Sequence, residues 1–225
     1  MAKIKKGRDL DRWKSNQPEA QVGKLRLIGG IHRGQQIAYS GDPITRPMKD
    51  NIREAVFNLV GGWIPGKLVF DLFAGTGAIG IEALSREAKH ATFIERHFPT
   101  SKIIRQNLES LHIATQATLE SSDTFFWTRQ FFKNLPDDPT PWAVFCSPPY
   151  DFFVERKAEM LELIERFKQH APPKSLIVVE SDDRFDPGEL PEPDQWNIRQ
   201  YAPALVAVWR DRDDEFEDET AASRD

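Results

Sequence analysis

The segment from residue 68 to residue 84 constrains the fold of this chain more than any other. Residues 68–72 are an apolar run that contains one acid, Asp71, and a turn with Gly75 and Gly77 follows at once. Apolar residues then recur at helical spacing up to residue 84. Glycine lets the backbone bend and approach a ligand closely, and the first turn of a helix carries free N–H groups. A buried strand, a glycine turn and a helix therefore suit a nucleotide-shaped ligand.

Three interpretations of this segment are open at this point. The spacing Gly75-x-Gly77-x-x-Gly80 matches the dinucleotide fingerprint, and Glu95 lies at about the distance expected for the acid that binds the ribose. An ordinary strand, turn and helix without a ligand would also carry such a pattern. The rest of the chain must distinguish these from the third interpretation, which is a methyl-donor site.

Residues 71–77, Asp-x-Phe-x-Gly-x-Gly, resemble motif I of S-adenosylmethionine methyltransferases. The resemblance implies that Asp71 holds the ammonium of the methionine part and that Glu95 takes the ribose hydroxyls. It also places Phe73, Ala74 and the two glycines of the turn, Gly75 and Gly77, against the cofactor.

Composition excludes several other classes of protein. At 225 residues the chain can bury a core as one large domain with appendages. Its one cysteine, Cys146, excludes an internal disulfide framework and suits a reducing compartment, so we expect a cytoplasmic protein. The sequence has no membrane-span run, no secretory leader pattern and no histidine or cysteine spacing typical of a metal site.

The charge is distributed unevenly along the chain. The net charge is −5, but residues 1–33 carry nine basic and three acidic residues, and residues 211–225 carry eight acidic and two basic ones. We interpret residues 1–22 as a basic flexible arm and residues 212–225 as an acidic disordered tail. The segment 23–62 is predicted to be a β-ribbon and helix extension, in which Lys24, Arg26 and Arg33 are candidates for contact with phosphates.

From residue 67 onward, strands and helices alternate, which predicts a mainly parallel sheet with helices on both faces in a domain over residues 63–211. The predicted strands are 68–72, 91–95, 115–120, 142–146, 175–180, 195–201 and 204–210, the last two as a hairpin, and the predicted helices after residue 76 are 77–86, one from about 99, 122–133 and 153–168. Ligands of such sheets bind outside the carboxyl ends of the strands.

Polar side chains follow four of the predicted strands. Asp71, Glu95, Asp123 and Ser147 each lie at or just past a strand end. Taken singly, Asp123 or Ser147 would be interpreted as a helix N-cap. Because the carboxyl ends of parallel strands share one edge of the sheet, we expect all four side chains to converge on one cleft.

The sequence Ser147-Pro148-Pro149-Tyr150 is the most specific signal in the chain. The two prolines fix φ and donate no N–H, so the turn is rigid and its carbonyls are free to accept. The Tyr150 ring can stack a base, which contributes about 1–3 kcal/mol. The motif resembles motif IV of amino-methyltransferases, which methylate an exocyclic NH₂ of a base. A nicotinamide dehydrogenase would need a proton donor beside the hydride site, and no obvious candidate follows the glycine turn.

Three segments together resemble the RsmD family, which methylates N2 of a guanine in bacterial 16S rRNA. They are residues 25–34, residues 46–58 (Arg-Pro-Met-Lys-Asp-Asn-Ile-Arg-Glu-Ala-Val-Phe-Asn) and residues 71–86, and the likeness runs in order over about residues 24–210. The segment 46–58 is more specific than motif I, and the resemblance to this particular family rests mainly on it.

The resemblance implies a class I methyltransferase fold, Rossmann-like, with a seven-stranded mainly parallel sheet. It implies S-adenosylmethionine as cofactor, 16S rRNA or a small ribosomal subunit particle as partner, no membrane and no metal, and we expect a monomer. It places Arg46 and Asp50 near the cofactor or the mouth of the site. Ser147, Pro148 and Tyr150 become the catalytic residues, and Asp123 accepts from the adenine amino group.

One departure from the family pattern bears on function. The family usually carries Asp at the first position of motif IV, where this chain has Ser147. A hydroxyl accepts a hydrogen bond but carries no charge. This leaves two alternatives: an amino-methyltransferase acting on another RNA or DNA base, and a nucleotide-binding RNA-binding module without turnover.

Overall fold

The structure is a computed structural model, and it describes residues 23–41 and 47–211. The predicted basic arm, the predicted acidic tail and Arg46 lie outside the described residues.

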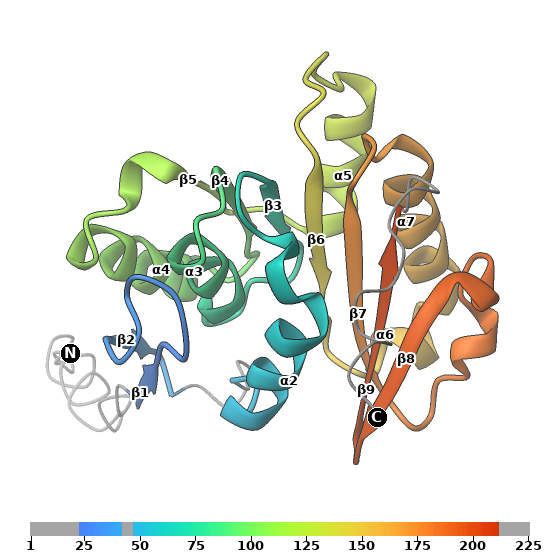
Figure 1. The fold of residues 1–225 in the computed structure, drawn as a ribbon, viewed down its shortest axis with the longest axis horizontal. Helices are drawn as coiled ribbons and strands as arrows, with labels where there is room; N and C mark the ends of the chain where they lie inside the picture. Colours follow the sequence, from blue (N-terminus) through green and yellow to red (C-terminus); the bar gives the residue numbers. More distant parts are fainter. Residues whose placement is uncertain (1–22, 42–46, 212–225) are drawn as a thin grey trace, which may run out of the picture.

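The described residues form a seven-stranded sheet and a separate two-stranded ribbon (Figure 1). In the large sheet the strand order is β5-β4-β3-β6-β7-β9-β8, and the first five strands in this order run parallel. The strands are β3 (Leu68–Asp71), β4 (His90–Ile94), β5 (Ala117–Glu120), β6 (Trp142–Cys146), β7 (Leu176–Asp182), β8 (Trp196–Tyr201) and β9 (Ala204–Arg210). The alternation of strands and helices thus gives the predicted parallel sheet, and β8 and β9 close it as the predicted antiparallel hairpin.

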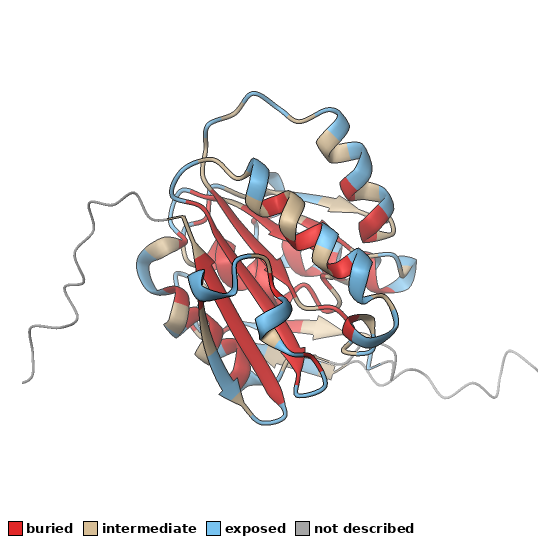
Figure 2. Ribbon diagram, turned by 90° about the vertical axis from the view of Figure 1, so that its right-hand side faces the viewer, coloured by how far each residue is buried: buried red, intermediate tan, exposed pale blue. Residues whose placement is uncertain are grey.

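Helices cover both faces of the sheet, and the sheet residues alternate between two apolar cores. In β3, for example, Val69 packs toward α2, α3 and α4, whereas Phe70 packs toward α5, α6 and α7. This alternation follows from the two-residue period of a strand. The helices are α2 (Asp50–Val60), α3 (Ala78–Ser85), α4 (Phe98–Ser110), α5 (Thr124–Lys133), α6 (Phe152–Glu155) and α7 (Lys157–His170). Figure 2 shows the central strands buried between helices whose outer faces are exposed.

The ribbon consists of β1 (Gly23–Arg26) and β2 (Gln36–Tyr39), which pair antiparallel as predicted. It is fastened to the main domain by buried polar groups. On α4, Asn107 accepts from Ala38 N at 2.9 Å and donates to Ala38 O at 2.8 Å. On α3, the fully buried Glu82 carboxylate accepts from the backbone N–H groups of Ile28 and Gly29 at 2.9 and 2.6 Å. The ribbon therefore has a fixed position beside α3 and α4.

The prediction of one helix over residues 153–168 is wrong. The structure has a short helix, α6, and a longer one, α7, with a break at Arg156, whose φ and ψ are −128° and 29°. The break lets Phe153 be buried against Phe185, with ring centroids 4.6 Å apart, while the apolar stripe of α7 packs on the sheet. Local periodicity does not reveal such a break because both pieces continue the same apolar pattern.

Candidate functional site

The carboxyl ends of four neighbouring strands bring the predicted polar residues to one edge of the sheet. Asp71, the last residue of β3, is level with Phe93 of β4 and Phe145 of β6 in the parallel registers. The glycine turn after β3 and the diproline turn after β6 therefore follow adjacent strands and leave the sheet at the same edge. This adjacency is what transfer between two bound ligands requires.

Backbone hydrogen bonds hold the glycine turn between its two neighbouring strands. Leu72 N donates to Phe145 O and Ala74 N donates to Ile94 O, each at 3.0 Å. Gly75 and Gly77 have φ of 51° and 74°, in the left-handed region that favours glycine. The turn is thus shaped by both neighbours of β3 and leads directly into α3.

Asp71 lies at the base of this turn and is almost fully buried, with 3% of its surface exposed. Its Oδ2 atom accepts from Gly80 N in the first turns of α3 at 3.0 Å. Burial raises the pKa of Asp71 to about 7, the Gly80 N–H acts in the opposite direction, and the charge of Glu95 raises it further. A nearby cation would lower this pKa again, so the site favours a positively charged ligand group.

Glu95 follows β4 and faces the same turn. Its carboxylate accepts from Gly75 N at 2.8 Å and from His97 N at 2.7 Å. The side chain is only partly buried. It therefore joins the glycine turn to the start of α4 while remaining accessible to a ligand.

Asp123 is the N-cap of α5, where its side chain accepts from Phe126 N at 3.0 Å. This is the helix-cap role that its position in the sequence also allowed, and the proposed contact with adenine stays a prediction. Phe98, the first residue of α4, is 71% exposed. An aromatic side chain so exposed, three residues after Glu95, can offer a ring face to a planar ligand.

The diproline turn carries Ser147, Pro148 and Tyr150 to the end of β6, as predicted. Pro148 is buried, whereas Ser147 and Tyr150 are partly exposed. The Tyr150 hydroxyl donates to Glu180 Oε1 at 2.8 Å. Burial and the neighbouring Glu180 carboxylate raise the pKa of Tyr150 above its ordinary value, so the phenol stays protonated and acts as a donor.

Glu180, in β7, belongs to the site although sequence reasoning did not select it. Its side chain is 7% exposed, and burial raises its pKa, while hydrogen bonding from Tyr150 and Ser147 acts to lower it. A signal was present in the sequence: Glu180 is an acid at the carboxyl end of an apolar strand, the same pattern that selected Asp71.

Asp50 lies at the start of α2, and the predicted RNA-binding residues lie on the ribbon and its connecting turn. Asp50 begins α2 and forms an ion pair with the buried Arg53 at 3.0 Å, so the structure gives it a partner that the sequence did not suggest. Lys24, Arg26 and Arg33 are exposed on the ribbon and its connecting turn. Their grouping on one exposed element is consistent with a basic surface.

The chemistry of these residues fits S-adenosylmethionine. Within the described part of the chain, neither Asp71 nor Glu95 forms an ion pair, so two acids face the glycine turn without a cation of their own. An amino-acid ammonium would supply the missing positive charge, and ribose hydroxyls could donate to Glu95. Among the described residues, no group of three or more metal-ligating side chains is present, and no helix has the length and apolar character to cross a bilayer.

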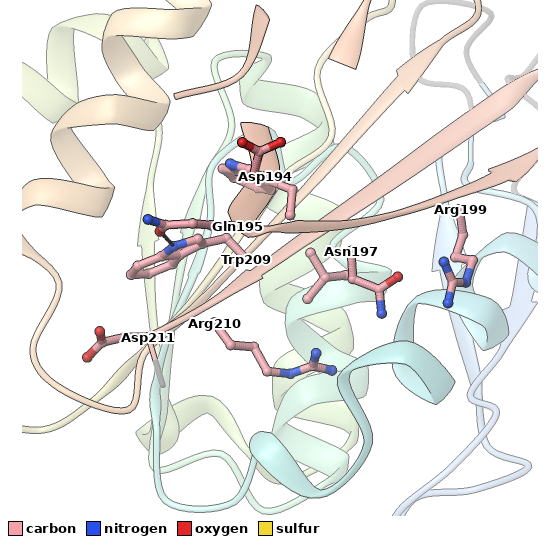
Figure 3. Close-up of a pocket in the computed structure, with 9 residues that line it drawn as sticks. Asp194, Gln195, Asn197, Arg199, Trp209, Arg210 and Asp211 are labelled. Atoms are coloured by element: carbon pink, nitrogen blue, oxygen red, sulfur yellow. Dashed lines mark hydrogen bonds between the residues drawn. The ribbon is translucent and has the colours of Figure 1, made fainter. Parts of the chain in front are cut away.

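A hollow in the surface lies elsewhere (Figure 3). It has a volume of about 620 Å³ and is lined by residues of the β8–β9 hairpin and of the segment before it. Trp209, one of these residues, pairs with Ile177 near the start of β7, so this part of the hollow faces the amino edge of the sheet. There Trp209 Nε1 donates to Gln195 Oε1 at 3.0 Å, and Arg210 donates to Leu59 O of α2. The hollow is therefore separate from the candidate site.

The chain is similar over most of its length to known proteins. The family described as Conserved hypothetical protein 95 matches residues 25–203. Ribosomal RNA small subunit methyltransferase D of Haemophilus influenzae is 30% identical over 198 residues, which cover 88% of this chain and 97% of that protein. The Escherichia coli K12 protein of the same name is 30% identical over 190 residues, covering 84% of this chain and 89% of that protein.

This chain belongs to the RsmD family. The solved structure of yhhF from Escherichia coli has a TM-score of 0.66 and 26% identity, and the match covers 85% of this chain and 99% of that chain. An RNA methyltransferase from Salinibacter ruber, solved with S-adenosyl-L-homocysteine, shares the fold with a TM-score of 0.52 and 18% identity over 77% of this chain and 98% of that chain. The predicted class I methyltransferase fold is thus confirmed, and RsmD family membership rests on nearly the whole described domain.

Proposed function

We propose that this RsmD family chain transfers a methyl group from S-adenosylmethionine to the exocyclic N2 amine of a guanine in 16S ribosomal RNA. The observation that carries the proposal is the adjacency of the glycine turn after β3 and the Ser147-Pro148-Pro149-Tyr150 turn after β6 at one edge of the sheet. Family membership over residues 25–203 supports the same activity.

The cofactor is assigned to the first of these turns. Asp71 holds the ammonium and Glu95 the ribose hydroxyls, and Phe73, Ala74, Gly75 and Gly77 shape the turn between them. Asp123 receives the adenine amino group, and Arg46 and Asp50 are assigned to the mouth of the site. When bound, S-adenosylmethionine supplies an electrophilic methyl group.

The target base is assigned to the second turn. A base must leave its stack to reach a buried reagent, and the Tyr150 ring is positioned to receive it. Ser147 Oγ and the Pro148 carbonyl each accept one N–H of the amine. These two acceptors orient the nitrogen lone pair, so the residues of this turn act mainly by positioning. Neither a metal nor a covalent enzyme intermediate is part of the proposal.

The RNA is assigned to the ribbon surface. Lys24, Arg26 and Arg33 contact phosphates of a structured RNA, which proteins recognise through its shape, its backbone and its splayed bases. A monomer that acts on rRNA or on a small-subunit particle in the cytoplasm is the simplest arrangement consistent with this assignment.

Methyl transfer to rRNA tests the activity directly. The purified chain, 16S rRNA and S-adenosylmethionine labelled in the methyl group should give labelled RNA whose modification maps to N2 of a guanine. We expect Tyr150→Ala to reduce the rate by about fivefold to a hundredfold, in line with the roughly 1–3 kcal/mol contributed by stacking. Binding of S-adenosylmethionine without any labelling of RNA would instead indicate an RNA-binding module without turnover.

Neutralising the ribbon tests the RNA surface. Replacing Lys24, Arg26 and Arg33 by Gln should weaken RNA binding and reduce the slope of log affinity against log salt by about 2–3, because each lost phosphate contact contributes about 0.7–0.9. The same number of charges removed from the other face, at Arg129, Lys133 and Arg166, serves as the matched control. Equal effects of the two triple variants would contradict the assignment.

A further inference from the structure

The buried carboxylate of Glu180 lies against the turn that the proposed function assigns to the target base. In the parallel register, Cys146 of β6 is level with Val179 of β7, so Ser147, the first residue after β6, comes beside Glu180 and hydrogen-bonds with its side chain. Adjacent strands lie about 4.8 Å apart, which brings the two side chains within reach of each other. Tyr150 approaches the same carboxylate from the turn, with its hydroxyl 2.8 Å from Oε1.

Both polar side chains of the turn thus meet one carboxylate that solvent hardly reaches. Glu180 is 7% exposed. Ser147 can donate its single O–H to Glu180 while its lone pairs stay available to accept an N–H from an amine. A hydroxyl that donates to an anion becomes a stronger acceptor, because neighbouring hydrogen bonds polarise one another. The Ser147 oxygen can therefore carry more negative partial charge toward the amine than an isolated hydroxyl would.

We propose that Glu180 is a positioning residue for the methyl transfer, which fixes Tyr150 and Ser147 relative to each other and places a negative charge behind Ser147. This inference rests on the proposed function. The positive charge that develops on the amine nitrogen is stabilised by the Glu180 carboxylate through the Ser147 hydroxyl, at a site where low solvent exposure strengthens the interaction. Only the ionised form of Glu180 does this.

Polar and charged groups from the diproline turn and from β7 surround Glu180. Tyr150 and Asp151 come from the turn, and Asp182 and Arg184 come from the end of β7 and the residues after it. Arg184 donates to Asp182 at 2.8 Å and to Asp151 at 2.9 Å, so these acids share a cation. On the β9 side Glu180 is level with the apolar Val206. Among the residues that the structure describes, Glu180 has no such cation as a partner, and burial raises its pKa.

The test is a steady-state comparison of the full-length protein with Glu180→Gln, which keeps the shape of the side chain and an acceptor for Tyr150 but removes the charge. We expect kcat to fall about tenfold to hundredfold, with KM for RNA and the affinity for S-adenosylmethionine within about twofold, a small change on the logarithmic affinity scale. Glu165→Gln, a partly buried acid on α7, is the matched control and should match the parent protein.

The pH profile separates this role from a merely structural one. At saturating S-adenosylmethionine, where Asp71 holds its ammonium, kcat of the parent should rise with pH through an apparent pKa above the ordinary value for Glu. Glu180→Gln should lose this acidic limb, and Glu180→Asp should restore part of it. Tyr150→Phe removes only the 2.8 Å hydrogen bond, which lowers the pKa of Glu180, so this variant should keep the acidic limb, shifted to higher pH, and should change KM for RNA.

The outcomes of these experiments distinguish the role of Glu180 from the proposed function. The role of Glu180 would be overturned if Glu180→Gln kept the kcat and the acidic limb of the parent protein. If Tyr150→Ala lost activity in the same assay, the proposed function would still stand. Loss of S-adenosylmethionine binding or of the native circular dichroism spectrum in Glu180→Gln would also overturn the role of Glu180, because the residue would then be structural. A parent protein that methylates no RNA would overturn both.

Discussion

Replacing Glu82 by Gln removes the charge that fastens the ribbon to the methyltransferase domain. The side chains of Glu82 and Arg53 are both 0% exposed, with Arg53 Nε 3.9 Å from Glu82 Oε2. Arg86, 27% exposed, forms the second ion pair at 3.0 Å. The same carboxylate also accepts two backbone N–H groups from the ribbon. A Gln side chain has one acceptor oxygen for these donors, so the variant leaves at least one buried N–H without its acceptor and removes the negative charge that faces Arg53 and Arg86.

The magnitude follows from the burial of these groups. Breaking a buried ion pair by removing one partner destabilises a protein by about 3–5 kcal/mol. Arg53 keeps Asp50 as a partner at 3.0 Å and Arg86 is partly hydrated, so we expect the lower end, about 3 kcal/mol. For a chain of this length, 1 kcal/mol corresponds to about 2–4 °C, which predicts a Tm lower by roughly 6–12 °C.

Urea and thermal unfolding measure this loss, with Glu162→Gln as the matched control. Glu162 has the same spacing to Arg166 that Glu82 has to Arg86, but its side chain is 69% exposed, so its removal should change stability by less than about 0.5 kcal/mol. Amide exchange at Ile31, which donates to Ser85 O at 2.7 Å, should accelerate in Glu82→Gln if the ribbon detaches first. Unfolding of the two variants at the same urea concentration would refute this reasoning.

Three further predictions concern single positions. Gly30→Ala should detach the ribbon, because a Cβ at this position, where φ is +74°, would lie 1.8 Å from Ser85 O. Gly34→Ala is the matched control: its φ is +86° but no heavy atom lies within 4 Å of the added Cβ, so it should lose only about 1–2 kcal/mol of stability in the same unfolding assay. The pKa of Asp71 is raised to about 7, so its contribution to folding stability should be complete below the ordinary Asp pKa and should be lost as pH rises through 7. The affinity for S-adenosylmethionine should change in the opposite direction and fall by up to about tenfold per pH unit below pH 7, because the ammonium needs the ionised carboxylate. Asp71→Asn should flatten both pH profiles, measured by chemical unfolding and by calorimetry. Cys146, buried with a raised thiol pKa, should react with a thiol reagent only after unfolding, and rapid reaction of the native protein would contradict the described packing.

Local sequence patterns predicted most of the fold. The apolar run at residues 142–146 coincides with β6, and the order of strands and helices implied the parallel sheet. These features are readable because strands and helices impose short periods on the sequence and because glycine and proline mark the turns between them. The predicted convergence of Asp71, Glu95, Asp123 and Ser147 follows in the same way, since parallel strands share their carboxyl edge.

The break at Arg156 and the docking of the ribbon could not be predicted in this way. The packing of Phe153 on Phe185 decides where the helix ends, and these residues are far apart in the chain. Arg53 and Glu82 lie in two different helices, and each alone has the pattern of an ordinary helical charge. Their complete burial together arises only when α2, α3 and the ribbon meet.

The sequence by itself determined which side chains reach the carboxyl edge of the sheet, because alternation and turn chemistry are local properties. Only the tertiary structure decided which of them share a partner. Glu180 meets Tyr150 because β6 and β7 are adjacent and in register, a relation set by pairing between strands whose first residues are 34 positions apart in the chain. Such pairing depends on the packing of both sheet faces at once, and no single stretch of sequence specifies it.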